Sequence, residues 1–521
     1  MSSNEKLAQS LERLKKLQDE GKVGLRADEL SRVHRERLIR AGFIKEVVKG
    51  WYIISPQDEQ PGDSTSWYIS FWGFVARYLK DRYGQHYCLS AEQSLLLHSK
   101  NTSVPGQLLV RSPFGNNRPT QLMFKTSLFM LKGSLPSDDE VDEWNGLRIF
   151  SLAASITDIN PSFYLKRPTD IRAALMMISD SSEILEPLLI GGHTVLAGRL
   201  AGAFRNMGQD KIADEIVIAM RMADYDVREK DPFQAPPPVT FRERSPYVNR
   251  LRLMWHQMRP VVLKHFPDIP GIPQDREAFL KQIEALYTTD AYHSLSIEKY
   301  TVTPELIERV RSGKWDHQNN ANDQRARDAM AARGYWQAFN KVKASIIHVL
   351  DGGNPGEVAN QDHGGWYREL FAPGVQAGLL KPSDLAGYRN HQVYIGQSKH
   401  TPVDKVGVRD SMPVLFELIQ EEEHPAVRAV LGHFLLVYIH PYMDGNGRMG
   451  RFLMNLMLIS GGYPWTVIPV EQRWEYMEAL ESASTLNDIE PFCQFMSWLV
   501  ESGLKGNPVA QITWANLSFP D

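Results

Sequence analysis

The sequence predicts a mainly α-helical protein whose N-terminal region also contains strands. Apolar residues recur at helical spacing through much of the chain after residue 240. Near the N-terminus, a basic helix-like run followed by two short apolar runs around Gly50 predicts an α+β unit. The Pro-rich segment from Asp231 to Pro238 separates the two halves, because consecutive prolines join neither a helix nor the interior of a sheet.

Composition places the chain among ordinary globular proteins. Of its 521 residues, 43% are hydrophobic and 23% are charged, which argues against long disordered segments. The formal net charge of -4 gives no global attraction to nucleic acid or anionic lipid, although a local basic patch is compatible with it. The two cysteines, Cys88 and Cys493, lie far apart in the sequence. We therefore expect free thiols in a reducing cytoplasm rather than a disulfide framework or a thiolate metal site.

No segment of the sequence has the pattern of a membrane span or a signal peptide. Residues 1–21 are polar and amphipathic and lack the apolar core of a signal peptide. The most apolar long stretch, Leu185 to Phe204, is interrupted by charged residues, glycines and Pro187. We expect packed helix there and a soluble protein.

The N-terminal segment has the element order of a winged helix-turn-helix. Four leucines at helical spacing predict a first helix, and a short helix is expected from Arg26 to Leu30. The basic run from Ser31 to Arg40 predicts the next helix, and Phe43 to Ile54 predicts a hairpin turning at Gly50. The four leucines are Leu7, Leu11, Leu14 and Leu17. We assign residues 1–56 to this unit.

Part of the N-terminal half resembles the abortive-infection antitoxin family. The resemblance lies in the run AGFIKEVVKGWYIIS at 41–55 and in the segment from Leu89 to Pro113. It implies an antitoxin-like α+β and helical domain over residues 57–230, and contact with duplex DNA through the basic helix. The alternative is a solvated basic face in a protein-interaction module. The arginines concerned are Arg32, Arg35, Arg37 and Arg40.

The C-terminal half, from residue 240 to 505, is expected to be helical. Its main candidate hairpin runs from Gln392 to Thr401. The runs that are helix-rich in composition and period are Glu277–Tyr287, Arg325–Leu350, Ser411–Gln420 and Ala426–Tyr438.

One short stretch, from His440 to Arg451, collects the residues expected for phosphoryl-type transfer. Proline and glycines between two apolar helical runs predict a tight loop that opens the second helix, where free N–H groups favour phosphate. His440 can take a proton from an attacking hydroxyl, and Asp444 can hold Mg²⁺ against phosphate oxygens. Arg448 and Arg451 are three residues apart, so they share a helix face and can grip phosphates.

This stretch resembles the Fic family signature, His-Pro-Phe-x-Asp/Glu-Gly-Asn-Gly-Arg-x-x-Arg, and departs from it only by having Tyr442 where phenylalanine is usual. The resemblance covers roughly residues 242–498. It implies an all-α Fic fold with a β-hairpin flap, His440 as general base and Asp444 as the Mg²⁺ ligand. The nucleotide-binding residues that it implies are Gly445, Asn446, Gly447, Arg448 and Arg451.

Two weaker features also fit the Fic family. The flap resemblance implies that Val393, Tyr394, Ile395 and Gly396 pair with an extended segment of the target protein. Ser294 and Glu298, four residues apart near the end of an inhibitory helix expected around 277–299, resemble the Fic inhibitory motif. In the family the glutamate pairs with the second signature arginine, here Arg451. Lys299 stands where the family has glycine or asparagine. The alternatives are an ordinary surface hairpin and a plain helix end.

The resemblance implies a protein adenylyltransferase that uses ATP and Mg²⁺ to modify a Tyr, Thr or Ser hydroxyl of a target protein and is inhibited by its own glutamate. Gly447 supports AMP transfer, because the phosphate-transferring Doc branch has lysine at this position. The alternatives are removal of AMP from a target, a DNA-binding toxin-antitoxin-type regulator whose Fic half modifies itself, and a silenced target-binding module. The target, the adenine pocket (for which Tyr476 and Asn487 are candidates) and a homo-oligomer are left open.

Overall fold

The protein consists of two compact units, each described here by itself. A computed structural model describes residues 3–57, 59–60, 62–233, 245–313 and 323–512. The first unit comprises residues 1–250 together with Tyr394–Thr401, and the second comprises Leu251–Val393 and the residues from Pro402 onward. The predicted boundary at Asp231–Pro238 lies mostly outside the described residues.

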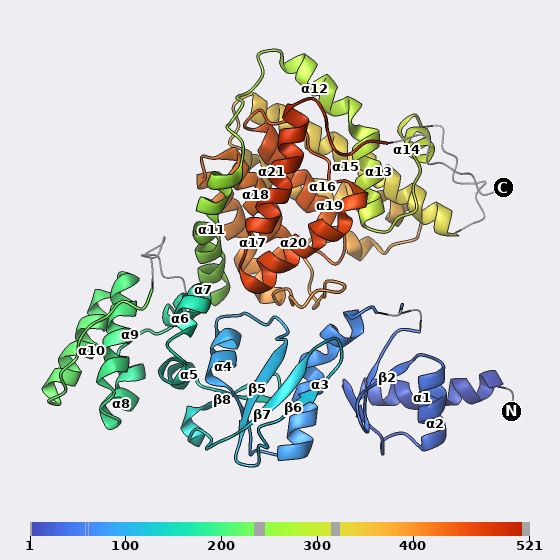
Figure 1. Cartoon of the computed structure of the whole chain (residues 1–521). Coiled ribbons are helices and arrows are strands. Elements are labelled where there is room, and N and C mark those ends of the chain that lie inside the picture. Colours follow the sequence, from blue (N-terminus) through green and yellow to red (C-terminus); the bar gives the residue numbers. More distant parts are fainter. Residues whose placement is uncertain (1–2, 58, 61, 234–244, 314–322, 513–521) are drawn as a thin grey trace. The chain divides into compact units, whose positions relative to one another are not determined.

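The first unit begins with a small α+β layer (Figure 1). Its elements are α1 (Ser3–Asp19), β1 (Gly24–Arg26), α2 (Arg32–Arg40), β2 (Ile44–Val48) and β3 (Trp51–Ile54). The antiparallel sheet has the order β1-β3-β2, and Gly50, with φ of 83°, forms the turn predicted for the hairpin. The short helix predicted from Arg26 to Leu30 is wrong. Arg26 ends β1 and a turn follows, so the strand pairing with Trp51 takes the place of helix.

Only part of the basic face predicted on α2 is open to solvent. Arg35 donates to the carbonyl of Ala27, and Arg37 donates to the carbonyl of Lys6 and to the Ser10 hydroxyl. Arg32 and Arg40 are exposed, and Arg32 pairs with Glu36. Two of the four arginines therefore anchor the helix to the rest of the unit.

The remainder of the first unit combines a four-stranded sheet, a hairpin and a helical group. The sheet order is β4-β5-β7-β6, with β5 and β7 parallel and the outer pairs antiparallel, and β8 pairs with β9. The strands are β4 (Cys88–Leu89), β5 (Gln107–Ser112), β6 (Pro119–Gln121), β7 (Ser127–Lys132), β8 (Val141–Trp144) and β9 (Leu147–Phe150). The helices are α3 (Thr65–Tyr83), α4 (Ala91–His98), α5 (Leu152–Asp158), α6 (Phe163–Lys166), α7 (Pro168–Leu175), α8 (Ser182–Ile190), α9 (Thr194–Asn206) and α10 (Asp210–Met222).

The apolar stretch from Leu185 to Phe204 forms two packed helices, as expected. It spans α8 and α9, which are separated at Gly191–His193, and Leu188, Leu200 and Phe204 are fully buried in the helical core. Among the described residues, no helix is both long enough and apolar enough to span a membrane. Cys88 and Cys493 are both buried free thiols.

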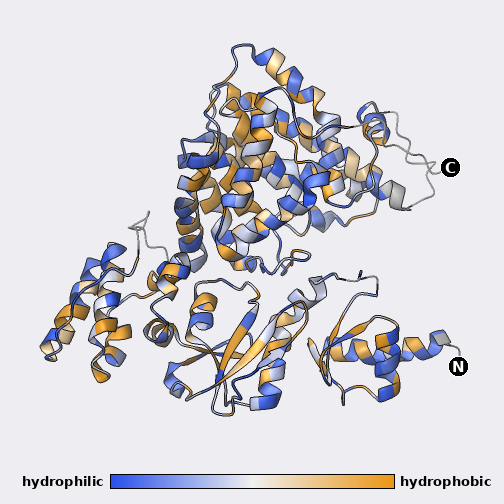
Figure 2. Cartoon of the chain, in the orientation of Figure 1, coloured by the Kyte–Doolittle hydropathy of each residue, from blue (hydrophilic) through white to orange (hydrophobic). Residues whose placement is uncertain are grey.

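The second unit is a bundle of α-helices in which no described residue lies in a strand. Figure 2 shows apolar residues concentrated in the helices at its centre, and α18 is buried almost all round. The helices are α11 (Pro246–His265), α12 (Arg276–Ala285), α13 (Tyr287–Ile297), α14 (Pro304–Arg311), α15 (Asp323–Leu350), α16 (Pro355–Gln376), α17 (Lys405–Glu421), α18 (Pro425–Ile439), α19 (Asn446–Ile459), α20 (Arg473–Leu486) and α21 (Glu490–Leu504). The four predicted helical runs match α12, α15, α17 and α18, and the segment around 277–299 forms two helices rather than one.

Candidate active site

The site is built on the sharp loop between α18 and α19. His440 ends α18 in the left-handed region, with φ of 53°, and Gly445 precedes α19 with φ of 83°. A Cβ at Gly445 would lie 2.9 Å from the Phe371 ring, so glycine is required there both by conformation and by space. A left-handed histidine is uncommon and is typical of functional sites.

His440 is arranged as a neutral base. Its Nδ1 lies 3.1 Å from the carbonyl oxygen of Val437. A carbonyl only accepts, so Nδ1 carries the proton and the Nε2 lone pair is left to take another. Burial lowers the pKa of His440 to about 4, which keeps the imidazole in its base form at neutral pH.

Arg389, a residue that sequence patterns did not single out, fixes the loop that carries His440. Its Nε donates to the His440 carbonyl at 2.7 Å, and its Nη1 donates to the carbonyl of His391 at 2.9 Å. Its backbone N–H donates to Pro441, and its Nη2 donates to Val403. Arg389 thus joins the catalytic loop to both ends of the segment that leads into and out of the predicted flap. No sequence spacing indicated this, because its partners are backbone carbonyls.

Asn446 shapes the loop through its side chain. Its Nδ2 donates to the Tyr442 carbonyl and its Oδ1 accepts from the Tyr442 N–H, both at 2.9 Å. Asp444 accepts from the Gly445 N–H at 2.6 Å, and its side chain is 62% exposed. An exposed carboxylate beside a phosphate-binding helix start fits Mg²⁺, which is commonly held by one or two carboxylates plus substrate phosphates.

Arg448 and Arg451 are deeply buried with unused donors. Their exposed fractions are 1% and 2%. Arg448 reaches Asp444 at 3.3 Å, while its Nε and the Nη1 of Arg451 have no hydrogen-bond partner among the described residues. Buried guanidinium donors cost free energy when they are unsatisfied. An anion bound at this helix start would accept hydrogen bonds from them.

The end of α13 contacts the guanidinium of Arg451, which is the pairing that the resemblance to the inhibitory motif implies. Glu298 Oε1 accepts from Arg451 Nη2 at 2.8 Å. Ser294 accepts from the same guanidinium twice, at 2.8 Å through its hydroxyl and at 3.0 Å through its carbonyl. A Cβ at Gly447 would lie only 2.2 Å from Glu298 Oε1. The carboxylate of Glu298 therefore fills the space next to the Cα of Gly447.

Lys299 occupies the one position in this helix end that favours glycine. Its φ is 65°, its N–H donates to the Ser296 carbonyl, and the Tyr300 N–H donates to the Leu295 carbonyl. This is the Schellman pattern, whose left-handed residue is usually glycine or asparagine. A lysine there costs about 1 kcal/mol or more, which weakens the helix end that carries Glu298.

A buried hydrogen bond between a tyrosine of α15 and an aspartate of α13 joins these two helices. Tyr335 donates to Asp290 Oδ2 at 2.7 Å, and both side chains are buried. Burial raises the pKa of Asp290 to about 6. Asp290, Ser294 and Glu298 recur every four residues and so share one helix face. The sequence analysis used only the last two, although the spacing could have identified the third.

The extra hydroxyl of Tyr442 finds neither a partner nor solvent. The ring is 1% exposed and stacks on Tyr367, with 4.0 Å between centroids. Its oxygen has no hydrogen-bond partner among the described residues. The neighbouring Tyr388, by contrast, pairs its hydroxyl with His363 Nε2 at 2.7 Å.

The predicted flap hairpin is wrong in its local structure. No residue from Gln392 to Thr401 lies in a strand, and a turn occurs at Gly396–Gln397. Gln392 closes the base of the segment by donating to the Pro402 carbonyl at 2.8 Å. With the strand ladder missing, backbone groups of Val393–Gly396 remain outside any sheet.

Tyr476 belongs to the core and Asn487 to a helix end. Tyr476 is 1% exposed and its hydroxyl lies 2.8 Å from His433 Nε2. Asn487 ends α20 with φ of 63°. His433 is therefore structural, as its position two turns before His440 indicates.

A neutral histidine, an exposed carboxylate and two buried arginines lie together around this helix start, an arrangement whose chemistry suits binding of phosphate groups. Residues 366–458 match the family model of the Fic/DOC family, so the chain carries a Fic/DOC domain, as its signature predicted.

Curated relatives agree with this assignment. Protein adenylyltransferase Fic of Drosophila virilis is 28% identical over 240 residues, which are 45% of this chain and 46% of that protein. The protein of the same name from Drosophila melanogaster is also 28% identical over 240 residues, 45% of each chain. The chain thus spans less than half the length of these relatives.

Two solved structures are similar at low identity. Fic-1 from C. elegans has 19% identity and a TM-score of 0.38, covering 63% of this chain and 91% of that chain. A Fic domain containing signaling protein from Bacteroides thetaiotaomicron has 18% identity and a TM-score of 0.33, covering 50% and 99%.

Replacing Tyr442 with phenylalanine should stabilise the protein. The change removes a buried hydroxyl without a partner, whose desolvation costs about 1–3 kcal/mol, and keeps the stacked ring. Tyr388→Phe is the matched control and should destabilise, because it leaves His363 without its partner. Denaturant unfolding of the three proteins measures both changes, and a Tyr442→Phe protein less stable than wild type would contradict this account.

Proposed function

We propose that this chain is a protein adenylyltransferase that moves AMP from ATP to a Tyr, Thr or Ser hydroxyl of a target protein. The observation that carries the proposal is the loop itself. It carries a neutral His440 whose Nε2 lone pair is left to accept a proton, and Asp444 and two buried arginines with unused donors follow within the same short stretch. The signature and the names of the curated relatives support the same chemistry.

We assign each residue of the site one role in the proposed reaction. The target hydroxyl oxygen attacks the α-phosphorus while His440 Nε2 takes the hydroxyl proton. The bond from the α-phosphorus to its bridging oxygen breaks, and pyrophosphate leaves with the bonding pair. Arg448, Arg451 and the backbone N–H groups at Gly445–Gly447 hold the phosphates in line, which is most of the catalysis in such reactions. Asp444 would hold Mg²⁺, which supplies charge neutralisation at the phosphate oxygens.

Val393–Gly396 are proposed to hold the target segment. Their backbone groups lie in no sheet, so an extended peptide could pair with them. Such pairing would create the strand ladder that the free segment lacks. We infer a cytoplasmic location from the two free thiols.

His440→Ala should abolish AMP transfer while leaving ATP binding in place, because a general base acts in proton transfer rather than in binding. The expected loss is about 10²–10⁴-fold. The measurement is incorporation from α-labelled and γ-labelled ATP, read together with mass spectrometry of the protein after incubation. Incorporation of γ-label would indicate kinase chemistry, and near-normal α-label transfer by folded His440→Ala would remove His440 from the mechanism.

Glu298→Gly should raise AMP transfer, including self-modification, because it frees Arg451 and the space over Gly447 for the γ-phosphate. A coupling of this kind typically changes a rate or affinity by about 5–150-fold. Arg451→Ala should not mimic it, since that change discards the phosphate contact together with the ion pair. The initial rate of α-label incorporation at equal protein concentration decides, and equal rates for wild type and Glu298→Gly would contradict inhibition.

Lys299→Gly is the matched control for the same helix end and should act in the opposite direction. Glycine relieves the left-handed strain of about 1 kcal/mol and holds Glu298 more firmly on Arg451. The basal rate should therefore fall, by up to about fivefold. A rise in basal rate would show that the Schellman end does not support the inhibited state.

Removal of AMP from a modified target is the second candidate activity. Glu298 favours it, because the carboxylate is 27% exposed beside Arg451 and can orient a water molecule. Release of AMP from a self-modified sample by wild type, and not by Glu298→Gly, would identify this activity.

The winged-helix unit is proposed to bind duplex DNA, on the strength of the exposed arginines of α2. Arg32→Ala with Arg40→Ala in the full chain should weaken binding and lower the slope of log affinity against log salt by about 2. Arg37→Ala is the control, since Arg37 holds α1 and α2 together. A gel-shift assay across salt concentrations measures this, and DNA affinity independent of salt would favour a protein-interaction module.

A further inference from the structure

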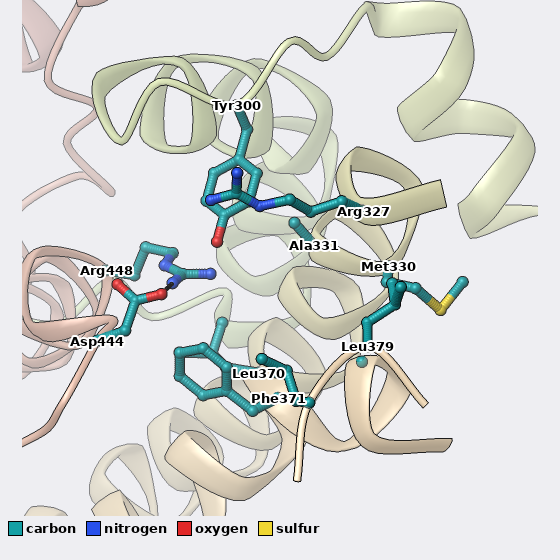
Figure 3. Close-up of a pocket in the computed structure, with 11 residues that line it drawn as sticks. Tyr300, Arg327, Met330, Ala331, Leu370, Phe371, Leu379, Asp444 and Arg448 are labelled. Carbon is teal, nitrogen blue, oxygen red and sulfur yellow. Dashed lines mark hydrogen bonds and ion pairs between the residues drawn. The ribbon is translucent and has the colours of Figure 1, made fainter. Parts of the chain in front are cut away.

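A pocket of about 430 Å³ lies next to the catalytic loop and is not explained by the residues assigned so far (Figure 3). Tyr300 and Arg327 line one side, Asp444 and Arg448 line another, and Leu370 and Phe371 contribute to an apolar wall. We call it the Tyr300 pocket. Two of its residues belong to the catalytic signature, so its contents lie within reach of the phosphate site.

Two cations face the ring of Tyr300. The guanidinium carbons of Arg327 and Arg448 each lie 5.2 Å from the ring centroid, and Arg448 lies 5.0 Å from the Phe371 centroid. Such stacking holds a guanidinium in place and leaves its N–H groups free to donate. Arg327 is exposed at the pocket edge and has no ion pair with any described side chain.

The position of Tyr300 follows from the inhibitory helix end. Tyr300 is the residue whose N–H closes the Schellman pattern, two residues after Glu298. The pocket therefore begins directly after the helix end that carries Glu298, and Tyr300 lines it together with Arg448. Its charged groups are two arginines and one carboxylate, so the pocket as a whole favours an anion. The apolar wall lowers the local dielectric and strengthens this attraction without adding hydrogen bonds that would retain the anion.

We propose that the Tyr300 pocket receives the pyrophosphate that leaves ATP, and that Arg327 is a positioning residue for it. The inference rests on the proposed AMP transfer. When the target oxygen bonds to the α-phosphorus, the bridging oxygen takes the electron pair and pyrophosphate is released, while the hydroxyl proton goes to His440. AMP stays attached to the target next to His440, so the leaving group departs from the other end of the phosphate chain. Arg327 is the solvent-exposed cation of the pocket that would receive the leaving pyrophosphate.

The experiment measures binding of magnesium pyrophosphate to the full-length protein by calorimetry, alongside binding of ATP and AMP. Arg327→Ala should weaken pyrophosphate binding about tenfold, because a charge-assisted hydrogen bond is lost, and should leave AMP binding unchanged. Arg327→Lys should restore part of the affinity. Arg333→Ala, which removes an exposed arginine from the same helix outside the pocket, is the matched control.

A kinetic readout separates this role from a structural one. Pyrophosphate should inhibit α-label transfer by the wild type at concentrations about tenfold lower than for Arg327→Ala. If Arg327→Ala and Arg333→Ala change pyrophosphate binding equally, or not at all, the pocket assignment is wrong. If both the wild type and Glu298→Gly bind ATP but neither transfers AMP, the proposed function is wrong. Pyrophosphate binding by Arg327→Ala and Arg333→Ala still tests the pocket in that case.

Discussion

The buried guanidinium of Arg451 is the constraint on which the site depends. A cation with 2% exposure needs partners, because an unpaired buried charge is strongly destabilising. Here the partners are Ser294 and Glu298 at the end of α13. A nucleotide phosphate would satisfy the same group equally well. Under the proposed function, Glu298 and a nucleotide phosphate would compete for this one cation, and that competition would regulate the active site.

The loop that carries His440, the proposed base, depends on a second buried arginine. Arg389 holds the carbonyl of His440 and the backbone on both sides of the flap segment, so the left-handed turn at His440 is set by contacts outside the signature. Burial lowers the pKa of Arg389 to about 10, and the group stays charged at neutral pH. Arg389 thus couples the position of His440 to the positions of the two ends of the flap segment.

Local sequence patterns predicted the parts of the site that are local in the chain. The loop from His440 to Arg451 and the spacing of Ser294 and Glu298 are short-range features, and the structure brings the two together as expected. Sequence patterns did not identify three further residues. Arg389 binds backbone carbonyls, which leave no mark on side-chain spacing. Tyr335 and Arg327 contact Asp290 and Tyr300, which lie far from them in the sequence. The flap was predicted as a hairpin from its resemblance to the Fic flap, whereas a strand also needs a pairing partner. On α2, charge predicted exposure, but Arg35 and Arg37 found carbonyl partners instead.

The central claim is that Glu298 excludes the γ-phosphate from Arg451. The most direct measurement is a pair of crystal structures, of wild type and of Glu298→Gly, each soaked with Mg²⁺ and an ATP analogue that cannot be cleaved next to the α-phosphorus. The account predicts a γ-phosphate within hydrogen-bond distance of Arg451 Nη1 in the variant, and in the wild type a nucleotide whose γ-phosphate does not reach Arg451. A wild-type complex with the γ-phosphate on Arg451 while Glu298 keeps its ion pair would contradict it.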